Sequence, residues 1–157
     1  MNAAFSLIVP VTVLALVTGL KDDAERAWLP GLLLGFVTAG MLLGLLQFSG
    51  AQFNNPLIND VPGEVSGNFA NRNHFAVFLA MGCLLAPVWA FLDGRQPGWR
   101  GPVALGLIIL FVLTILASGS RAGIVAGSLA LVLGLGMVWQ GVRRTLKQYP
   151  RWVSFAL

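Results

Sequence analysis

Charge is scarce in this sequence. Asp, Glu, Lys and Arg together make up 10% of the 157 residues, whereas hydrophobic residues make up 57%. Because soluble domains carry roughly 25% charged residues, this composition excludes an ordinary soluble domain. It is typical of a protein that lies in a lipid bilayer.

Cysteine and histidine are almost absent as well. The chain has one cysteine, Cys83, and one histidine, His74. A lone cysteine cannot form an intramolecular disulfide or a CxxC metal site, so we expect no metal site. The sequence also shows no repeat of fixed period and no low-complexity segment.

The few charges cluster and leave long uncharged stretches between them. A transmembrane helix needs about 20 consecutive apolar residues, and each stretch is long enough for one. The sequence therefore predicts an all-α, polytopic transmembrane helix bundle with about five complete spans, near 3–20, 28–47, 74–92, 102–118 and 122–140. The C-terminal WVSFAL is typical of the opening of a sixth span. We expect residues 1–157 to be a single transmembrane region and a fragment of a longer polytopic protein.

The basic residues indicate how the helices are oriented. Short cytoplasmic loops of membrane proteins are enriched in Lys and Arg. Because successive spans cross the membrane in opposite directions, one side holds loops 21–27, 93–101 and 141–151. These loops contain eight of the ten basic residues, and the other two are Arg72 and Arg121. Membrane topology thus accounts for most of the excess of basic residues behind the net charge of +4, and we expect no nucleic-acid partner.

Arg72 and Arg121 fall on the opposite side, each beside the N-terminus of a predicted helix. A cation there opposes the helix dipole by about 0.3 to 1 kcal/mol, so local structure does not explain these residues. A helix N-terminus does favour phosphate, and a guanidinium binds phosphate oxygens through two parallel hydrogen bonds. We therefore expect the two arginines to bind a diphosphate. The alternative is that each one only extends to lipid phosphates.

Small polar residues surround the two arginines in the segments NFANRNH and ASGSRAG. Asn and Ser side chains can cap helices, and they can also donate hydrogen bonds to an oxyanion. We expect five residues to line the site, namely Asn71, Asn73, His74, Ser118 and Ser120. For His74, a neutral and capped interfacial histidine is an equally good interpretation.

Small residues also form a stripe in the last predicted span. Gly123, Gly127, Ala130 and Gly134 follow one another at spacings of four, three and four residues, which places them on one face of a helix. Such small residues let two helices approach closely in a membrane. We expect this stripe to contact a neighbouring helix.

Two motifs in the chain resemble a known family. SGNFANRNHFAVFLA and, later, LTILASGSRAG are similar to the core of the O-antigen ligase and polymerase superfamily, over about residues 60–140. In that superfamily a G-x-F-x-N-x-N-x-x-A turn enters one helix and an S-x-S-R-[AG] turn enters another. The matching residues are Gly67, Phe69, Asn71, Asn73 and Ala76, followed by Ser118, Ser120, Arg121 and Ala122.

The resemblance implies a multi-pass glycosyltransferase of the bacterial inner (cytoplasmic) membrane, with its active face in the periplasm. Such enzymes transfer a glycan from undecaprenyl diphosphate to lipid A-core, in a ligase, or to another repeat unit, in a polymerase. They use no cofactor and no metal. The expected partners are therefore undecaprenyl-diphosphate-linked glycan, lipid A-core or a glycan acceptor, and membrane lipids.

The resemblance also implies that Arg121 and Arg72 bind the substrate diphosphate. The superfamily's general base is a histidine on a large periplasmic loop after the second motif, and this chain ends before such a loop. No catalytic residue is therefore assigned, His74 does not take that role, and we expect the chain alone to be inactive. A polymerase remains an alternative to a ligase. A transporter fragment or a non-catalytic membrane remnant that binds an anionic lipid is the alternative of another class.

Overall fold

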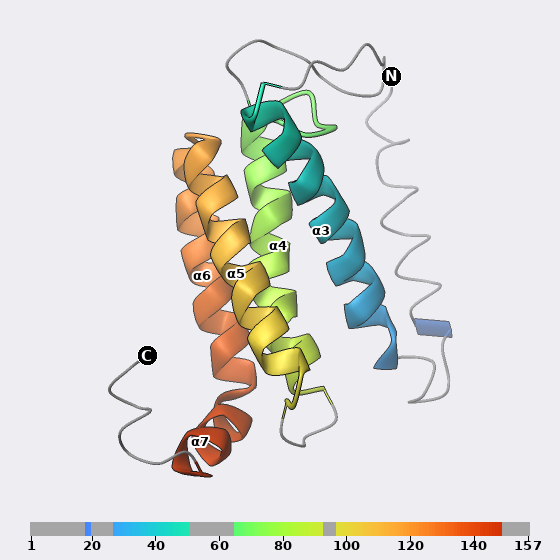
Figure 1. Ribbon diagram of the computed structural model, residues 1–157, viewed down its shortest axis with the longest axis vertical. Helices are drawn as coiled ribbons and strands as arrows, with labels where there is room; N and C mark the ends of the chain where they lie inside the picture. Colours follow the sequence, from blue (N-terminus) through green and yellow to red (C-terminus); the bar gives the residue numbers. More distant parts are fainter. Residues whose placement is uncertain (1–17, 20–26, 51–64, 93–96, 149–157) are drawn as a thin grey trace.

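The computed structural model describes residues 18–19, 27–50, 65–92 and 97–148 (Figure 1). Within these residues the chain is helical and contains no β-strand, which confirms the predicted all-α fold for this part. The helices are α3 (Leu29–Phe48), α4 (Arg72–Ala90), α5 (Arg100–Ala117), α6 (Arg121–Met137) and α7 (Trp139–Gln148).

Three of the helices, α3, α4 and α5, are long and apolar enough to cross a membrane. α6 meets the same condition only together with α7, and the two are bent by 68°. The described residues therefore hold three candidate spans, or four if the bent pair is one span. The predicted first span and the C-terminal WVSFAL lie outside the described residues.

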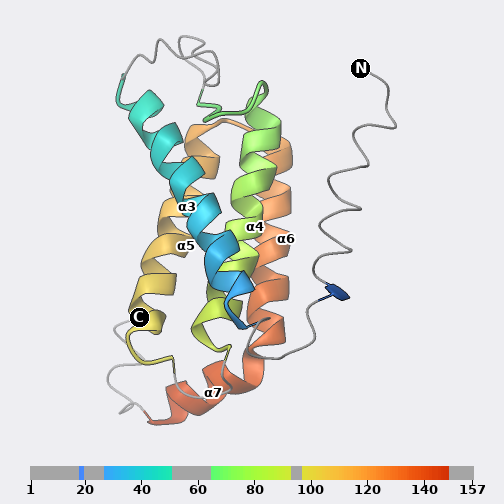
Figure 2. The ribbon, with the colours of Figure 1, turned by 90° about the vertical axis from the view of Figure 1, so that its right-hand side faces the viewer.

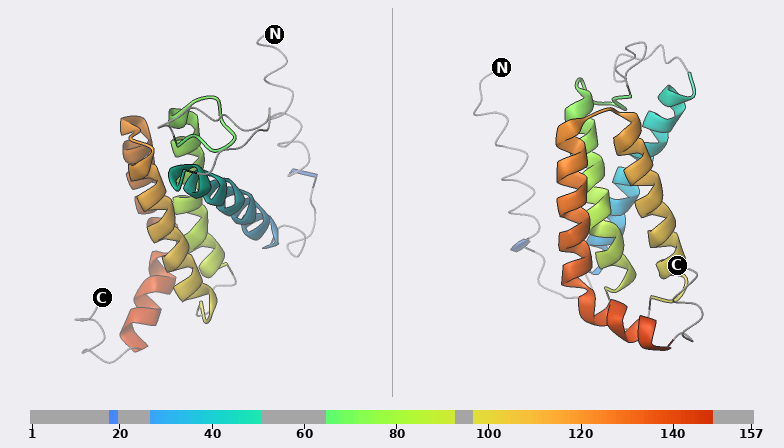
Figure 3. Two further views of the ribbon diagram at one scale, coloured as in Figure 1. Left: turned by 45° about the horizontal axis from the view of Figure 1, so that its top comes forward. Right: turned by 90° about the vertical axis from the view of Figure 1, so that its left-hand side faces the viewer.

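The spans alternate in direction. α3 and α5 run one way along the bundle, and α4 and α6 run the other way (Figures 1 and 2). α4 contacts all three of the other spans and packs most extensively against α6. Figure 3 shows α4 and α6 side by side along their length.

α4 is the central helix, because it packs against each of the other three spans. Half of the residues in its most apolar 18-residue stretch are buried in the bundle, whereas in α3 and in α5 the share is 22%. Phe75, Leu79, Cys83 and Ala86 are fully buried on α4, at spacings of three or four residues that place them on one face. This face forms the core of the bundle.

The outer surface of the bundle is also apolar. About two thirds of the surface of three large apolar side chains is exposed: Phe36 on α3 (68%), and Val125 (69%) and Val132 (67%) on α6. Helices that are apolar on all sides belong in lipid, where exposed side chains of this kind face acyl chains. The burial pattern is therefore that of a membrane-spanning bundle.

The predicted stripe of small residues on α6 does contact a neighbouring helix. A Cβ added at Gly123 would overlap Ala76 of α4, and one added at Gly134 would lie 2.8 Å from the carbonyl oxygen of Leu84. Gly127 instead faces Ile115 of α5. Glycine on this stripe allows the close approach of α4 and α6, and the prediction is confirmed.

Candidate functional site

The N-termini of α4 and α6 lie side by side at one end of the bundle, because the two helices run in the same direction (Figure 3). Arg72 is the first residue of α4, and Arg121 is the first residue of α6. The structure therefore brings together the two helix starts that carry the predicted diphosphate-binding residues.

The turn that leads into α4 is held by a side chain from α3. Gln47 accepts hydrogen bonds from the backbone N–H groups of Ser66, at 3.1 Å, and Gly67, at 2.7 Å, and donates one to the carbonyl oxygen of Gly67, at 3.0 Å. Gly67 has a φ of +59° and packs against the ring of Phe75, so both its backbone and its surroundings require glycine. The contacts fix where α4 begins.

Aromatic rings pack behind this turn. The ring of Phe69 lies 5.1 Å from that of Phe78 and 6.1 Å from that of Phe75, measured between centroids. Tilted rings at such distances attract one another and bury apolar area. Phe69, the aromatic residue of the first motif, thus anchors the turn to α4.

Two side chains cap the two helices, as the sequence predicts. Asn71 precedes α4, and its side-chain oxygen accepts a hydrogen bond of 2.7 Å from the N–H of Asn73. Ser120 precedes α6, and its hydroxyl oxygen accepts one of 3.0 Å from the N–H of Gly123. Each cap satisfies one of the N–H groups that a helix N-terminus leaves without a partner in the helix.

A hydrogen bond joins the two helix starts directly. The Ser120 hydroxyl donates to the side-chain oxygen of Asn73, at 2.8 Å. Ser118 supports this arrangement, since its hydroxyl donates to the carbonyl oxygen of Ile115, at 2.7 Å, and accepts from the N–H of Ser120, at 3.3 Å. The two motifs therefore meet through the Ser120–Asn73 hydrogen bond.

The five predicted lining residues divide into two groups. Asn71, Asn73 and His74 are exposed at the end of the bundle, whereas Ser118 and Ser120 are buried and bond to protein groups. The serines were expected to face a ligand together with the asparagines. In the structure they instead position the helix starts, because their hydroxyl groups point into the protein.

Both arginines are exposed beside these groups. A Cβ added at Gly119 would lie 4.0 Å from Nη1 of Arg72, so the guanidinium of Arg72 reaches over the turn that precedes Arg121. Two cations at two parallel helix N-termini combine their charge with the positive ends of both helix dipoles. This arrangement favours an anion with several oxygen atoms.

The other basic residues of the described segments lie at the opposite end of the bundle. Arg100 begins α5 there, and Arg143, Arg144 and Lys147 lie on α7 (Figure 1). This agrees with the uneven distribution of basic residues that the sequence predicts. Arg72 and Arg121 are thus separated from the main group of cations by the length of the spans.

Gln47 and Gly67 are site-forming residues whose contacts the sequence interpretation missed. Gln47 is the one amide side chain in α3, where Thr38 is the other polar residue, and it stands in the last turn of that helix. A polar residue at such a place indicates a specific partner, because an unpaired polar group is costly in an apolar environment. That signal is present in the sequence, but its partner on the turn before α4 is not.

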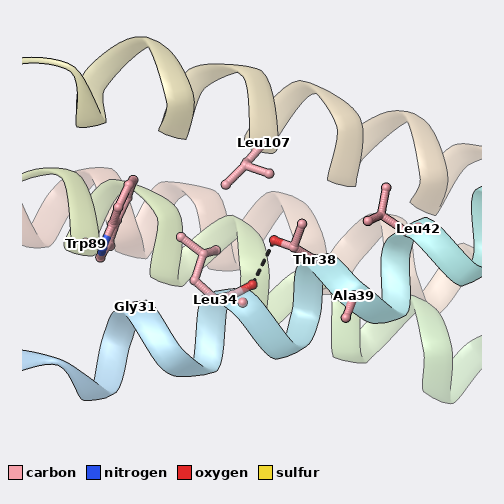
Figure 4. A pocket seen from close by; sticks show the side chains of 8 residues that line it. Gly31, Leu34, Thr38, Ala39, Leu42, Trp89 and Leu107 are labelled. Atoms are coloured by element: carbon pink, nitrogen blue, oxygen red, sulfur yellow. Dashed lines mark hydrogen bonds between the residues drawn. The ribbon is translucent and has the colours of Figure 1, made fainter.

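A separate crevice opens between α3, α4 and α5 (Figure 4). It has a volume of about 350 Å³ and is lined by Gly31, Leu34, Gly35, Thr38, Ala39, Leu42, Trp89 and Leu107. The only hydroxyl in its wall, that of Thr38, donates to the carbonyl oxygen of Leu34 in its own helix, at 2.8 Å. The crevice is therefore apolar and is distinct from the site at the helix N-termini.

The structure identifies no group of three His, Cys, Asp or Glu residues that could hold a metal ion among the residues it describes. Comparison with protein-family models, with curated proteins and with solved structures finds no match to this chain. The assignment of a function therefore rests on the residues and the geometry of the site.

Proposed function

We propose that this chain is part of a membrane glycosyltransferase of the O-antigen ligase type. It would lie in the bacterial inner membrane as a multi-pass protein with about five complete spans and the start of a sixth. At the periplasmic face it would transfer a glycan from undecaprenyl diphosphate to lipid A-core or another acceptor. A polymerase of the same superfamily is the alternative that shares both motifs.

One observation carries the proposal. Arg72 and Arg121 begin two parallel helices whose starts are joined by the Ser120–Asn73 hydrogen bond, at the end of the bundle opposite the main group of cations. Neither arginine is favoured there by its own helix dipole. An anionic ligand such as a diphosphate compensates both charges and accepts hydrogen bonds from both guanidinium groups.

The proposed reaction explains why the site needs cations. The acceptor hydroxyl forms a bond to C1 of the donor sugar while the bond between C1 and the diphosphate oxygen breaks, and undecaprenyl diphosphate leaves. The hydroxyl proton passes to a base that is not assigned to this chain. Negative charge grows on the leaving diphosphate, and the guanidinium groups of Arg72 and Arg121 stabilise that charge more in the transition state than in the ground state.

The size of the effect can be estimated. Removing one preorganised donor of this kind costs about 2.7 to 4 kcal/mol, or roughly 100-fold to 1000-fold in rate. We therefore expect Arg121→Ala to abolish detectable transfer. Arg121→Lys keeps the charge but loses the planar fork, and it should retain only a small part of the activity.

The test uses the complete reading frame, expressed in a strain that lacks its own ligase. Wild type, Arg121→Ala, Arg121→Lys and Arg143→Ala are compared at equal abundance in the membrane, and glycan attached to lipid A-core is detected on a silver-stained gel. Arg143 is the matched control, because it is an exposed arginine at the other end of the bundle. Arg143→Ala should leave the ladder of glycosylated lipid nearly intact.

Each outcome distinguishes the alternatives. Equal losses for Arg121→Ala and Arg143→Ala would reject the role of Arg121. If wild type gives no ladder but makes longer glycans on undecaprenyl diphosphate, the protein is a polymerase. If no glycan changes in a host that makes a compatible donor, the glycosyltransferase proposal fails, and uptake of a labelled substrate into liposomes would then indicate a transporter.

A further inference from the structure

α7 differs in character from the spans that precede it. Its sequence, WQGVRRTLKQ, contains three basic residues and no acidic one. The apolar residues Trp139, Val142 and Leu146 are spaced three and four residues apart and therefore share one face of the helix. Off that face lie Arg143, Arg144 and Lys147, all exposed. α7 is thus amphipathic, with one apolar stripe and a basic surface.

The direction of α7 also changes at the end of the bundle. α6 ends at Met137, and α7 begins at Trp139 after a bend of 68°. Figure 2 shows α7 running across the end of the bundle rather than along it. A helix that turns by this angle at the end of a span lies closer to the plane of the membrane than to its normal.

Tryptophans mark the level at which this turn occurs. Four of the five tryptophans, Trp28, Trp89, Trp99 and Trp139, stand at the ends of helices on this side of the bundle. The rings of Trp89 and Trp99 are 5.5 Å apart, and Arg100 lies over the ring of Trp89. Because tryptophan is enriched at membrane–water interfaces, this level is that of the interface, and α7 begins at it.

The apolar stripe of α7 is exposed, as are apolar residues of α6. Val132 and Met137 of α6 are 67% and 71% exposed, and Trp139 and Leu146 of α7 are 55% and 49% exposed. The side of α7 that meets the bundle is a different one, since a Cβ added at Gly141 would lie 2.6 Å from the ring of Phe91. The bundle therefore does not cover the stripe, and Trp139 and Leu146 can meet another apolar surface.

We propose that α7 is an interfacial helix that binds the anionic headgroups of membrane phospholipids. Its apolar stripe lies at the boundary between headgroups and acyl chains, and Arg143, Arg144 and Lys147 bind lipid phosphates. Amphipathic helices with Trp and Leu on one face and Lys or Arg on the other bind bilayers in this way. Three cations without an acidic neighbour in the helix favour a negatively charged leaflet over a neutral one.

The first test measures the depth of α7 in vesicles that contain the full chain. Spin labels are attached to Leu146→Cys, on the apolar stripe, and to Gln140→Cys, which is exposed off that stripe. Cys83 is fully buried, so the chain without an introduced cysteine serves as the blank. We expect the label at 146 to collide more with oxygen and the label at 140 more with a water-soluble nickel complex. Equal exposure of both labels to the nickel complex would overturn the proposal.

The second test measures lipid preference. In mixed vesicles of phosphatidylcholine and phosphatidylglycerol, quenching of a fluorophore at 146 by spin-labelled forms of each lipid reports which headgroup is nearby. One basic residue near an anionic surface changes association by about fivefold, so the preference for phosphatidylglycerol should fall at least that much in Arg143→Gln/Arg144→Gln/Lys147→Gln. Arg143→Lys/Arg144→Lys keeps the charge and should keep the preference. An unchanged preference in the glutamine variant would refute headgroup binding by α7.

Discussion

Removing the Ser120 hydroxyl should separate the starts of α4 and α6, because this one group makes two hydrogen bonds. It accepts from the N–H of Gly123 and donates to Asn73, and Ser120 is only 1% exposed. Loss of a helix cap costs about 1 kcal/mol, and a hydrogen bond between membrane helices contributes about 0.6 kcal/mol. We therefore expect Ser120→Ala to lower the free energy of unfolding by about 1.6 kcal/mol.

The two contributions can be separated with variants of the partner. Asn73→Ala removes only the bond between the helices, and it should cost about 0.6 kcal/mol. In the double variant Ser120→Ala/Asn73→Ala this bond is lost only once, so the total should remain about 1.6 kcal/mol. Asn71→Ala removes the cap of α4 alone and provides a reference of about 1 kcal/mol for capping.

The assay is unfolding in mixed micelles with increasing dodecyl sulfate, followed by circular dichroism and by modification of Cys83 with N-ethylmaleimide. Cys83 is the one cysteine of the chain and is fully buried on α4, so its modification reports the opening of the bundle. If the effects of Ser120→Ala and Asn73→Ala simply add in the double variant, the two side chains are not coupled. That result would refute the hydrogen bond as the link between the helix starts.

Two further predictions concern packing and the turn before α4. Gly134→Ala should destabilise the bundle by about 1 to 3 kcal/mol, because its Cβ would lie 2.8 Å from the Leu84 carbonyl oxygen. A Cβ at Gly136 would have no neighbouring atom within 4 Å, so Gly136→Ala should be neutral or stabilising. The same unfolding assay compares them, and equal effects would contradict the close approach of α4 and α6. Gln47→Leu leaves two buried N–H groups without their acceptor and should cost about 2 kcal/mol, with faster hydrogen exchange at Ser66 and Gly67. Gln140→Leu on α7 is the exposed control, and unchanged exchange in Gln47→Leu would reject the role of Gln47.

The spans were predictable because charged and turn residues delimit them. The predicted ranges 28–47, 74–92 and 102–118 differ from α3, α4 and α5 by at most two residues at either end. The range 122–140 was predicted as one span; in the structure α6 ends at Met137 and α7 begins at Trp139 after a bend of 68°. The signal for this turn is the change at Trp139 from an all-apolar pattern to an amphipathic one, which the count of uncharged residues does not detect.

The placement of both helix starts on one face was predictable, but the contacts between them were not. The sequence predicted helix caps among the Asn and Ser residues of the two segments, and Asn71 and Ser120 are those caps. It also placed Ser118 and Ser120 at the surface of the site, whereas the structure buries both side chains. The direction of each serine hydroxyl depends on how α4 and α6 are aligned along their length. The stripe of small residues on α6 predicts a close neighbouring helix, but it does not predict which residues of that helix lie beside the serines.

Most residues of the two motifs have a structural role, so their presence is not by itself evidence for a chemical reaction. Gly67 is required by its backbone conformation, Phe69 packs under the turn, and Asn71 caps α4. A bundle that only had to fold would have reason to keep all three. Arg72 and Arg121 are different, because they are exposed and stand where the helix dipoles oppose a cation.

An enzyme and a non-catalytic membrane remnant should therefore differ in which variants lose activity and which lose stability. If the proposed function is correct, Arg121→Ala removes activity while the free energy of unfolding stays the same or rises slightly, since an opposed cation has been removed. Ser120→Ala should do the reverse, lowering stability first and activity only as the helix starts separate. A remnant without chemistry would depend on the residues that hold the helix starts and tolerate the loss of both arginines, so stability and activity must be measured on the same variants.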